Sequence, residues 1–483
     1  MKKELILNVI PPEVWKGDIL FTLSPAPEVS APGFPGKDAG DVRVLESEGQ
    51  TGGKNNLRVQ VSMGPQAKIN LESIRRSGAA ISNWLVKNGV ENAALDMKGL
   101  ESIDFPGARQ ALLEGLLLGA FRFDRFKTGL ANQAEIRLDI LAQDANPVRQ
   151  DIDQMTTVAS AVNLAREWGH EPPNVINPVS LASRAVQFAS ENSLKCTVFD
   201  EKQLREMGAG ALYSVGIGSK TPSRLIVLEY PGAGVSPQDR PVALVGKAIT
   251  FDTGGYSLKD RNGMLGMKYD KCGGMAVLGV LQAAAGLKLA VPLVGLIAAA
   301  ENMVSENSYR PDDIITTLSG KTVEVVSADA EGRLVLCDAL TYAQTHYHPR
   351  ALIDLATLTG GMVTALGYLR AGFMSNDDNL SGALIASGER THELLWRFPL
   401  DDEYFDLIKG DDSDMKNSGP RVATPIIGAI FLKQFVAGDI PWAHLDIAGV
   451  ADTEKDLPYC PSGATGFGVR LLLDYLQHLE QPA

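Results

Sequence analysis

The spacing of apolar residues divides the chain into two stretches of different character. Over residues 1–150, short runs with alternating apolar positions predict β-strands, and two amphipathic patterns predict helices at 70–88 and 107–121. The strand candidates read ELILNVI, DILFTLS, LRVQVSM and EIRLDILA. We therefore expect a small α/β domain in this part of the chain.

Residues 151–170 have helical spacing and are followed by Pro172 and Pro173, which stop a helix. Beyond them, strongly apolar runs alternate with helical patterns. The strand candidates there are SRLIVLEY, PVALVGKAI, VPLVGLIAAA, TVEVVS, ALIDLAT and AHLDIAG, and helices are expected at 273–287, 334–346, 424–436 and 466–479. Apolar strands that alternate with helices predict a mainly parallel sheet flanked by helices.

The expected fold is therefore α/β with two domains: a smaller domain over 1–150, a linker helix over 151–170 and a larger domain over 171–483. A length of 483 residues agrees, because one hydrophobic core rarely serves a chain of this size. Ligands of an open parallel sheet bind at the carboxyl ends of its strands. Functional residues are therefore expected directly after the strand candidates.

Composition narrows the classes of function. A hydrophobic fraction of 45% with 48 glycines and 26 prolines is ordinary for a globular protein. The net charge of −13, without any block of basic residues, argues against nucleic acid as the main partner. Four scattered cysteines without a CxxC pair favour a reducing cytoplasm. The longest apolar region is broken by polar residues, so we expect no membrane segment.

Seven charged residues lie within or beside the apolar runs of the larger domain. They are Lys247, Asp252, Lys259, Asp270, Asp329, Glu331 and Arg333. Carboxylates in such surroundings are costly unless a partner neutralises them, and the four negative charges equal those of two divalent cations. The cations at 259 and 333 would remain beside the metals, where a developing oxyanion needs them. The set predicts a two-metal hydrolase.

Each of these motifs also has a structural interpretation. Asp329, Glu331 and Arg333 follow TVEVVS at alternate positions, so an extended chain would direct them to one side, with Gly332 turning the chain into a helix from 334. Alone, this pattern is more often a solvated loop. Lys247, taken alone, is better explained by pairing with the acid at 252, and the glycine-flanked acids by turn formation.

Competing catalytic motifs are incomplete. The Gly-Lys pair at 246–247 lacks the first glycine of a phosphate-binding loop, and the single DTGG sequence lacks the second copy that an aspartic protease needs. There is no GxSxG motif, and the glycine pairs at 208–210 and 216–218 lack the third glycine of a dinucleotide-binding loop. A two-metal phosphoesterase is a further alternative, although such sites usually recruit histidines and none accompanies these carboxylates.

The sequence resembles the leucyl aminopeptidase family of dinuclear metallopeptidases (the M17 type). The match lies in ALLEGLLLGAFRFDRFK (111–127), VGKAITFDTGGYSLK (245–259), MKYDKCGG (267–274), ENM (301–303), YRPDDIITTLSGKTVEVVSADAEGRLVL (309–336), DLATLTGG (354–361) and GATGFGVRLL (463–472). It is strong from about residue 110 onward and keeps the spacing of all seven charged residues. The resemblance implies that 171–483 is the catalytic peptidase domain.

Within that resemblance, Asp252 and Glu331 bridge two divalent ions, Asp329 completes one site, and Lys247 and Asp270 complete the other. Zn or Mn is expected, with Mg or Co as alternatives. The implied reaction is removal of single N-terminal residues, with Leu or Met preferred, through attack of a metal-bound water. The resemblance also implies a homohexamer with its catalytic domains facing inward.

The resemblance further implies that Lys259 polarises the scissile carbonyl and that Arg333 holds a bicarbonate as general base. The residues that it places in the pocket for the first side chain are Met267, Thr357, Gly360, Ala448 and Ala451. A runner-up is a nucleic-acid-binding or regulatory protein that keeps the peptidase fold, as some relatives do.

Two positions depart from the family pattern. Many relatives carry a methionine where this chain has Ala451, so we expect a roomier pocket. The family commonly has Asn-Thr where this chain has Ser327 and Ala328, just before the Asp-Ala-Glu-Gly-Arg motif. Loss of an amide there predicts a weaker but active enzyme, because hydrogen bonds behind metal ligands often change affinity or activity tenfold or more.

Overall fold

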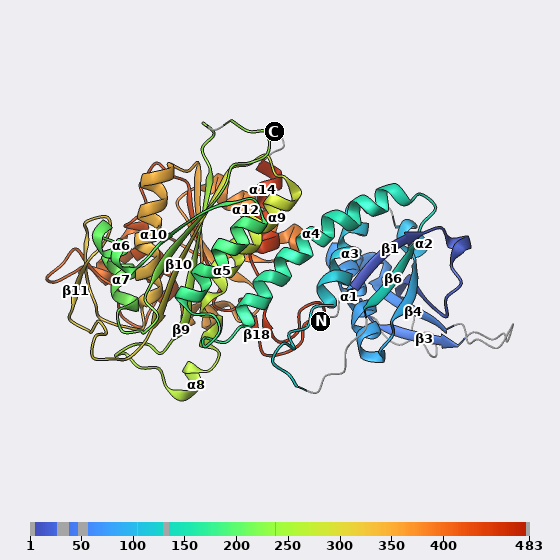
Figure 1. The fold of residues 1–483 in the computed structure, drawn as a ribbon, viewed down its shortest axis with the longest axis horizontal. Helices are drawn as coiled ribbons and strands as arrows, with labels where there is room; N and C mark the ends of the chain where they lie inside the picture. The colour runs from blue at the N-terminus through green and yellow to red at the C-terminus, as the bar shows by residue number, and fades with distance from the viewer. Residues whose placement is uncertain are drawn as a thin grey trace. The chain divides into compact units, whose positions relative to one another are not determined.

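The structure is a computed structural model that describes residues 5–26, 38–46, 57–103, 105–128, 135–236 and 238–479. The chain forms two compact units (Figure 1), one comprising Met1–Asn163 with Glu454–Ser462 and the other Leu164–Thr453 with Gly463–Ala483. The division falls inside the long helix α4 (Ala145–His170), which includes the segment expected as a linker helix. No helix of the described ranges is long and apolar enough to cross a membrane.

The N-terminal unit contains a six-stranded sheet in the order β1-β6-β5-β2-β4-β3. All its pairings are parallel except that of β3 with β4. Its elements are β1 (Leu5–Ile10), η1 (Pro12–Val14), β2 (Ile19–Ala26), β3 (Val42–Glu46), β4 (Leu57–Pro65), η2 (Gln66–Lys68), α1 (Leu71–Asn88), β5 (Asn92–Asp96), α2 (Lys98–Glu101), α3 (Ala108–Gly119) and β6 (Ile136–Leu141). The four strands and two helices expected here are confirmed, whereas β3 and β5 were not expected.

The C-terminal unit is built on an eight-stranded sheet in the order β15-β14-β17-β13-β9-β10-β8-β7. The central strands β17, β13, β9 and β10 are parallel, which confirms the predicted α/β class. The strands are β7 (Lys195–Phe199), β8 (Arg224–Tyr230), β9 (Val242–Asp252), β10 (Leu293–Asn302), β13 (Ala351–Ala356), β14 (Ala371–Ser375), β15 (Leu395–Arg397) and β17 (Trp442–Asp446). Within the described chain, antiparallel pairs in this sheet join β14 to β17, β8 to β10 and β7 to β8.

Helices cover both faces of this sheet, with α6, α7 and α10 on one side and α5, α9 and α14 on the other (Figure 1). The helices are α5 (Pro178–Glu191), α6 (Glu201–Met207), α7 (Gly210–Gly216), α8 (Arg261–Met264), α9 (Cys272–Leu287), α10 (Glu331–Tyr347), α11 (Gly360–Leu366), α12 (Asp378–Thr391), α13 (Thr424–Lys433) and α14 (Val469–Leu479). The remaining elements are η3 (Met267–Lys271), η4 (Asp402–Ile408), β11 (Ile314–Thr316), β12 (Thr322–Glu324), β16 (Met415–Lys416), β18 (Asp452–Thr453) and β19 (Gly463–Ala464).

Two local predictions were wrong. The run TVEVVS is not a strand of the main sheet: only β12 forms there, and it pairs with β11 and β16 in a small separate sheet. The charged residues that follow are not extended either, because Ala330 N–H donates to Ser327 O (3.2 Å) in a turn and α10 begins at Glu331, before the glycine expected to precede it.

Candidate metal centre

The parallel strands β9, β10, β13 and β17 end at one edge of the sheet, and the predicted site residues gather there. Lys247 lies within β9 and Asp252 ends it, while Asn302 ends the neighbouring β10. The chain leaves β9 through Gly254 and Gly255, whose φ angles of 82° and 58° favour glycine. This turn brings the chain back, and Lys259 N–H donates to Thr253 O at 2.9 Å.

The first turn of α10 supplies two more site residues, because Glu331 is its first residue and Arg333 its third. A carboxylate is favoured at this position by the helix dipole. Gly332 lies between them, and a Cβ there would come within 2.7 Å of the Lys247 Nζ. Glycine at this position therefore leaves room for the Lys247 ammonium against the helix, and a larger residue would have to displace it from its two carboxylates.

Each lysine of the site lies between two carboxylates. Lys247 Nζ is 2.9 Å from Asp270 Oδ1 and 2.9 Å from Glu331 Oε1. Lys259 Nζ is 2.9 Å from Asp252 Oδ2 and also contacts Asp329. The structural interpretation of Lys247 as the ion-pair partner of Asp252 is thus wrong.

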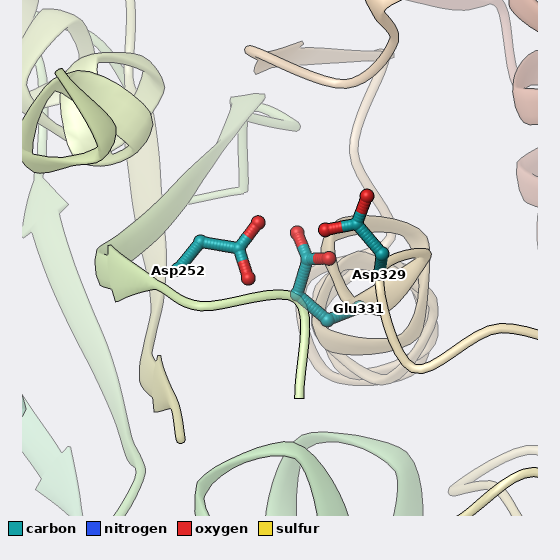
Figure 2. A group of neighbouring side chains, drawn as sticks. All are labelled: Asp252, Asp329 and Glu331. Atoms are coloured by element: carbon teal, nitrogen blue, oxygen red, sulfur yellow. The ribbon is translucent and has the colours of Figure 1, made fainter. Parts of the chain in front are cut away.

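Figure 2 shows Asp252, Asp329 and Glu331 pointing toward one another from the end of β9 and the start of α10, and oxygens of all three lie within 4.8 Å of one another. The buried oxygens Asp270 Oδ2 and Glu331 Oε2 have no hydrogen-bond partner among the residues described. Such oxygens are costly unless paired, and carboxylate oxygens suit divalent cations. Four carboxylates against two ammonium groups leave two negative charges, so the residues fit metal binding.

The carboxyl groups are held in different protonation states. Burial raises the pKa of Asp270 to about 7, and burial together with the charge of Glu331 raises the pKa of Asp329 to about 6. Burial alone would raise the pKa of Glu331, but the charges of Lys247 and Lys259 outweigh it and hold this pKa below its usual value. At acidic pH, Asp270 and Asp329 are therefore protonated, and the two lysine ammonium groups are charged as well.

We expect a divalent ion to displace these protons when it binds. Because the pKa values of Asp270 and Asp329 are raised to about 7 and about 6, these acids are protonated below those pH values and ionised above them. Apparent Mn²⁺ affinity should therefore fall as the pH drops below about 7, by about tenfold per pH unit for each proton displaced. Calorimetry at pH 6 in two buffers of different ionisation enthalpy measures the release, and equal enthalpies in both would contradict it.

Arg333 is buried beside this cluster. Its Nη1 donates to Asn417 O at 2.8 Å, and its Nε has no hydrogen-bond partner in the described part of the chain. Burial lowers the pKa of Arg333 to about 10, so the guanidinium stays charged at neutral pH. An unpaired donor on a buried cation is suited to an anionic ligand.

Two asparagines that were not among the predicted site residues hold the segment before α10. Asn417 Oδ1 accepts from Val326 N–H (2.8 Å) and Ser327 N–H (3.2 Å), and its Nδ2 donates to Ser327 O (2.6 Å). Asn302 Nδ2 donates to both Asp252 Oδ1 (2.8 Å) and Ala328 O (2.9 Å). Side-chain amides therefore do contact this turn and a candidate metal ligand, although residues 327 and 328 themselves carry none.

The predicted pocket residues all lie in the C-terminal unit, close to these elements. Met267 begins η3, Gly360 begins α11, and Ala448 and Ala451 follow β17. Thr357 follows β13, and its hydroxyl donates to Asp270 Oδ1 at 2.6 Å while its carbonyl accepts from Lys247 Nζ at 2.9 Å. Ala451 is the most buried of them, with 1% exposure.

Known proteins match both parts of this chain. Residues 163–473 match the catalytic domain of the cytosol aminopeptidase family, and residues 39–129 match its N-terminal domain. The probable cytosol aminopeptidase of Syntrophotalea carbinolica is 46% identical over 424 residues, which cover 86% of this chain and 84% of that protein. That of Cenarchaeum symbiosum is 40% identical over 451 residues, 92% of this chain and 91% of that protein. The solved structure of the bottromycin maturation enzyme BotP in complex with Mn matches with a TM-score of 0.86 and 31% identity, over 96% of this chain and 100% of that one.

Proposed function

The chain belongs to the cytosol aminopeptidase family and is a metal-dependent aminopeptidase, and from that premise we propose that it releases single N-terminal residues, preferably Leu or Met, from peptides. The observation that carries the proposal is the cluster of Asp252, Asp329 and Glu331 with oxygens within 4.8 Å of one another at the carboxyl edge of the sheet. Mass spectrometry tests it: a peptide should lose residues stepwise from its N-terminus, whereas its N-acetylated form should stay intact.

We assign two divalent ions to Lys247, Asp252, Asp270, Asp329 and Glu331, which would hold them through the carboxylate oxygens and through the Lys247 amine after it has lost its proton. Mn is supported by the bound metal of the BotP structure, and Zn, Mg and Co suit the same donors. When bound, such ions polarise a carbonyl group and lower the pKa of the attacking water.

Lys259 is assigned to the scissile carbonyl. Its side chain is 17% exposed, whereas that of Lys247 is 3% exposed, so of the two lysines Lys259 is the one a substrate can reach. Burial would lower the pKa of Lys259, but the nearby carboxylates outweigh it and raise the pKa, so the group is charged. A fixed ammonium of this kind stabilises the oxyanion that develops on the carbonyl.

Arg333 is assigned to a bicarbonate that acts as general base. The support is its buried guanidinium, whose Nε lacks a hydrogen-bond partner within the described residues. The planar guanidinium can hold the planar anion through paired hydrogen bonds. Held there, the anion would supply a general base for the attacking water.

Ala451 sets the size of the proposed first-residue pocket. Its backbone is fixed by hydrogen bonds to Ile447 O and from Thr465 N–H, both 2.9 Å, so a longer side chain at 451 cannot move the chain aside easily. Ala451→Met is expected to lower kcat/KM for Phe-p-nitroanilide about tenfold relative to Leu-p-nitroanilide, because added atoms narrow the pocket. An unchanged ratio, in a variant with wild-type Tm, would show that residue 451 does not limit the pocket.

We also propose a homohexamer and a cytoplasmic location. The hexamer rests on the family resemblance alone, and the location on the name of the curated relatives. Sedimentation of the purified protein measures the first, and a particle of one or two subunits would contradict it.

A further inference from the structure

We propose that Asp446 is a positioning residue that holds together the two loops of the first-residue pocket and, through one of them, two metal ligands. The inference rests on the proposed function and adds a residue to it. Asp446 ends β17 and is fully buried. An ionisable group in that position is costly unless its hydrogen bonds compensate for the lost hydration.

The carboxylate of Asp446 accepts three hydrogen bonds from two different loops. Its Oδ1 accepts from Leu358 N–H (3.1 Å) in the loop after β13 and from Ala448 N–H (3.2 Å) in the loop after β17. Its Oδ2 accepts from the Thr359 hydroxyl at 2.6 Å. Hydrogen bonds to a charged acceptor are the strong ones, so this side chain fixes the spacing of the two loops.

The loop after β13 is tied to the metal centre on its other side. Thr357, directly before the two residues that donate to Asp446, accepts from Lys247 through its carbonyl (2.9 Å) and donates to Asp270 Oδ1 through its hydroxyl (2.6 Å). Three consecutive residues, 357–359, therefore connect Asp446 to two proposed ligands. A shift of this loop would move the pocket wall and loosen the ligands together.

A buried histidine supports the charge of Asp446. His444 lies two residues earlier on the same side of β17, and its Nδ1 is 2.6 Å from Asp354 Oδ1. Trp442 Nε1 donates to the other oxygen of Asp354 at 2.8 Å. Burial would lower the pKa of His444, but the charges of Asp354 and Asp446 outweigh it and raise this pKa. Burial raises the pKa of Asp446, and the charge of His444, together with the hydrogen bonds from Thr359, Leu358 and Ala448, acts against that rise.

Asp446→Ala tests the proposal, with Asp338→Ala as the matched control. Asp338 is also a buried acid that accepts from backbone N–H groups, those of Leu212 (2.9 Å) and Leu318 (2.8 Å), but it contacts neither pocket loop. Asp446→Ala should lower the Leu-over-Ala ratio of kcat/KM about tenfold and weaken Mn²⁺ binding about tenfold. Asp338→Ala should lower Tm and leave both quantities at their wild-type values.

Two milder variants keep the test decisive if Asp446→Ala does not fold. Asp446→Asn keeps an oxygen for the two N–H donors and should restore the ratio to within about threefold of wild type, whereas Thr359→Val, which removes only the hydroxyl, should lower it about threefold. A uniform fall of kcat/KM for all substrates with wild-type Mn²⁺ affinity would overturn the positioning role. A wild-type protein without peptidase activity would instead overturn the proposed function, and Mn²⁺ affinity would still report on Asp446.

Discussion

Glu331→Gln is expected to lower kcat for Leu-p-nitroanilide by at least about a thousandfold and to remove most Mn²⁺ binding. Glu331 belongs to both halves of the cluster: its Oε1 pairs with Lys247 at 2.9 Å, and its oxygens lie near those of Asp252 and Asp329. Its other oxygen is buried with no hydrogen-bond partner among the described residues. The amide has nearly the same shape but loses the charge and one acceptor, so the effect isolates the ligand role from packing.

Glu114→Gln is the control for this variant. Glu114 is also a buried glutamate paired with a basic side chain, that of Arg75, but it lies in the N-terminal unit. It should reduce Tm and leave kcat within about twofold of wild type, because a broken ion pair costs stability wherever it lies. Wild-type turnover in Glu331→Gln would remove this residue from the metal centre.

Lys259→Met is expected to separate catalysis from metal binding. Its ammonium is bonded to Asp252 and Asp329, so it competes with a divalent ion for the same oxygens. Removing it should leave Mn²⁺ affinity unchanged or raise it, while kcat falls by about 100- to 1000-fold through loss of oxyanion stabilisation. Calorimetry gives the affinity, and turnover is measured at saturating Mn²⁺.

The control for this second variant is Lys433→Met, which removes a lysine that pairs with Asp402 at 2.6 Å outside the cluster. Lys433→Met should keep both the Mn²⁺ affinity and kcat at their wild-type values. If Lys259→Met instead loses Mn²⁺ affinity and regains full kcat at saturating Mn²⁺, the lysine supports the ligands and does not act on the carbonyl.

Apolar runs predicted the central strands because these strands are buried on both faces. Strands with weaker apolar patterns were not predicted. The run KCTVF forms the edge strand β7 and AGFMS forms β14, although neither was expected. TVEVVS is apolar enough for a core strand, but Asn417 binds its last two residues from a loop about ninety positions away. Hydrogen bonds from a residue far away in the sequence can override a local preference for a strand. Nothing in the neighbouring sequence reveals such bonds.

The site was predicted in its residue types more fully than in its geometry. The sequence proposed seven charged residues for the site, and the structure joins six of them through ion pairs or close carboxylate oxygens. The helix was expected to begin at Leu334, with Gly332 as the residue that turns the chain into it. In the structure that glycine lies inside the first turn, where it leaves room for Lys247. Asn302, Asn417 and Asp446 were missed because their partners are distant in the sequence or their hydrogen bonds depend on the fold.

We propose that two divalent ions in this cluster carry the peptidase activity. The most direct test is to strip the protein with a chelator, titrate Mn²⁺ back, and follow Leu-p-nitroanilide hydrolysis together with bound metal per subunit. We predict no activity in the stripped protein and a maximum when two ions are bound per subunit, because the five proposed ligands are assigned to two ions. Full activity in the stripped protein, or a maximum with one ion bound, would show that a pair of ions does not carry the activity.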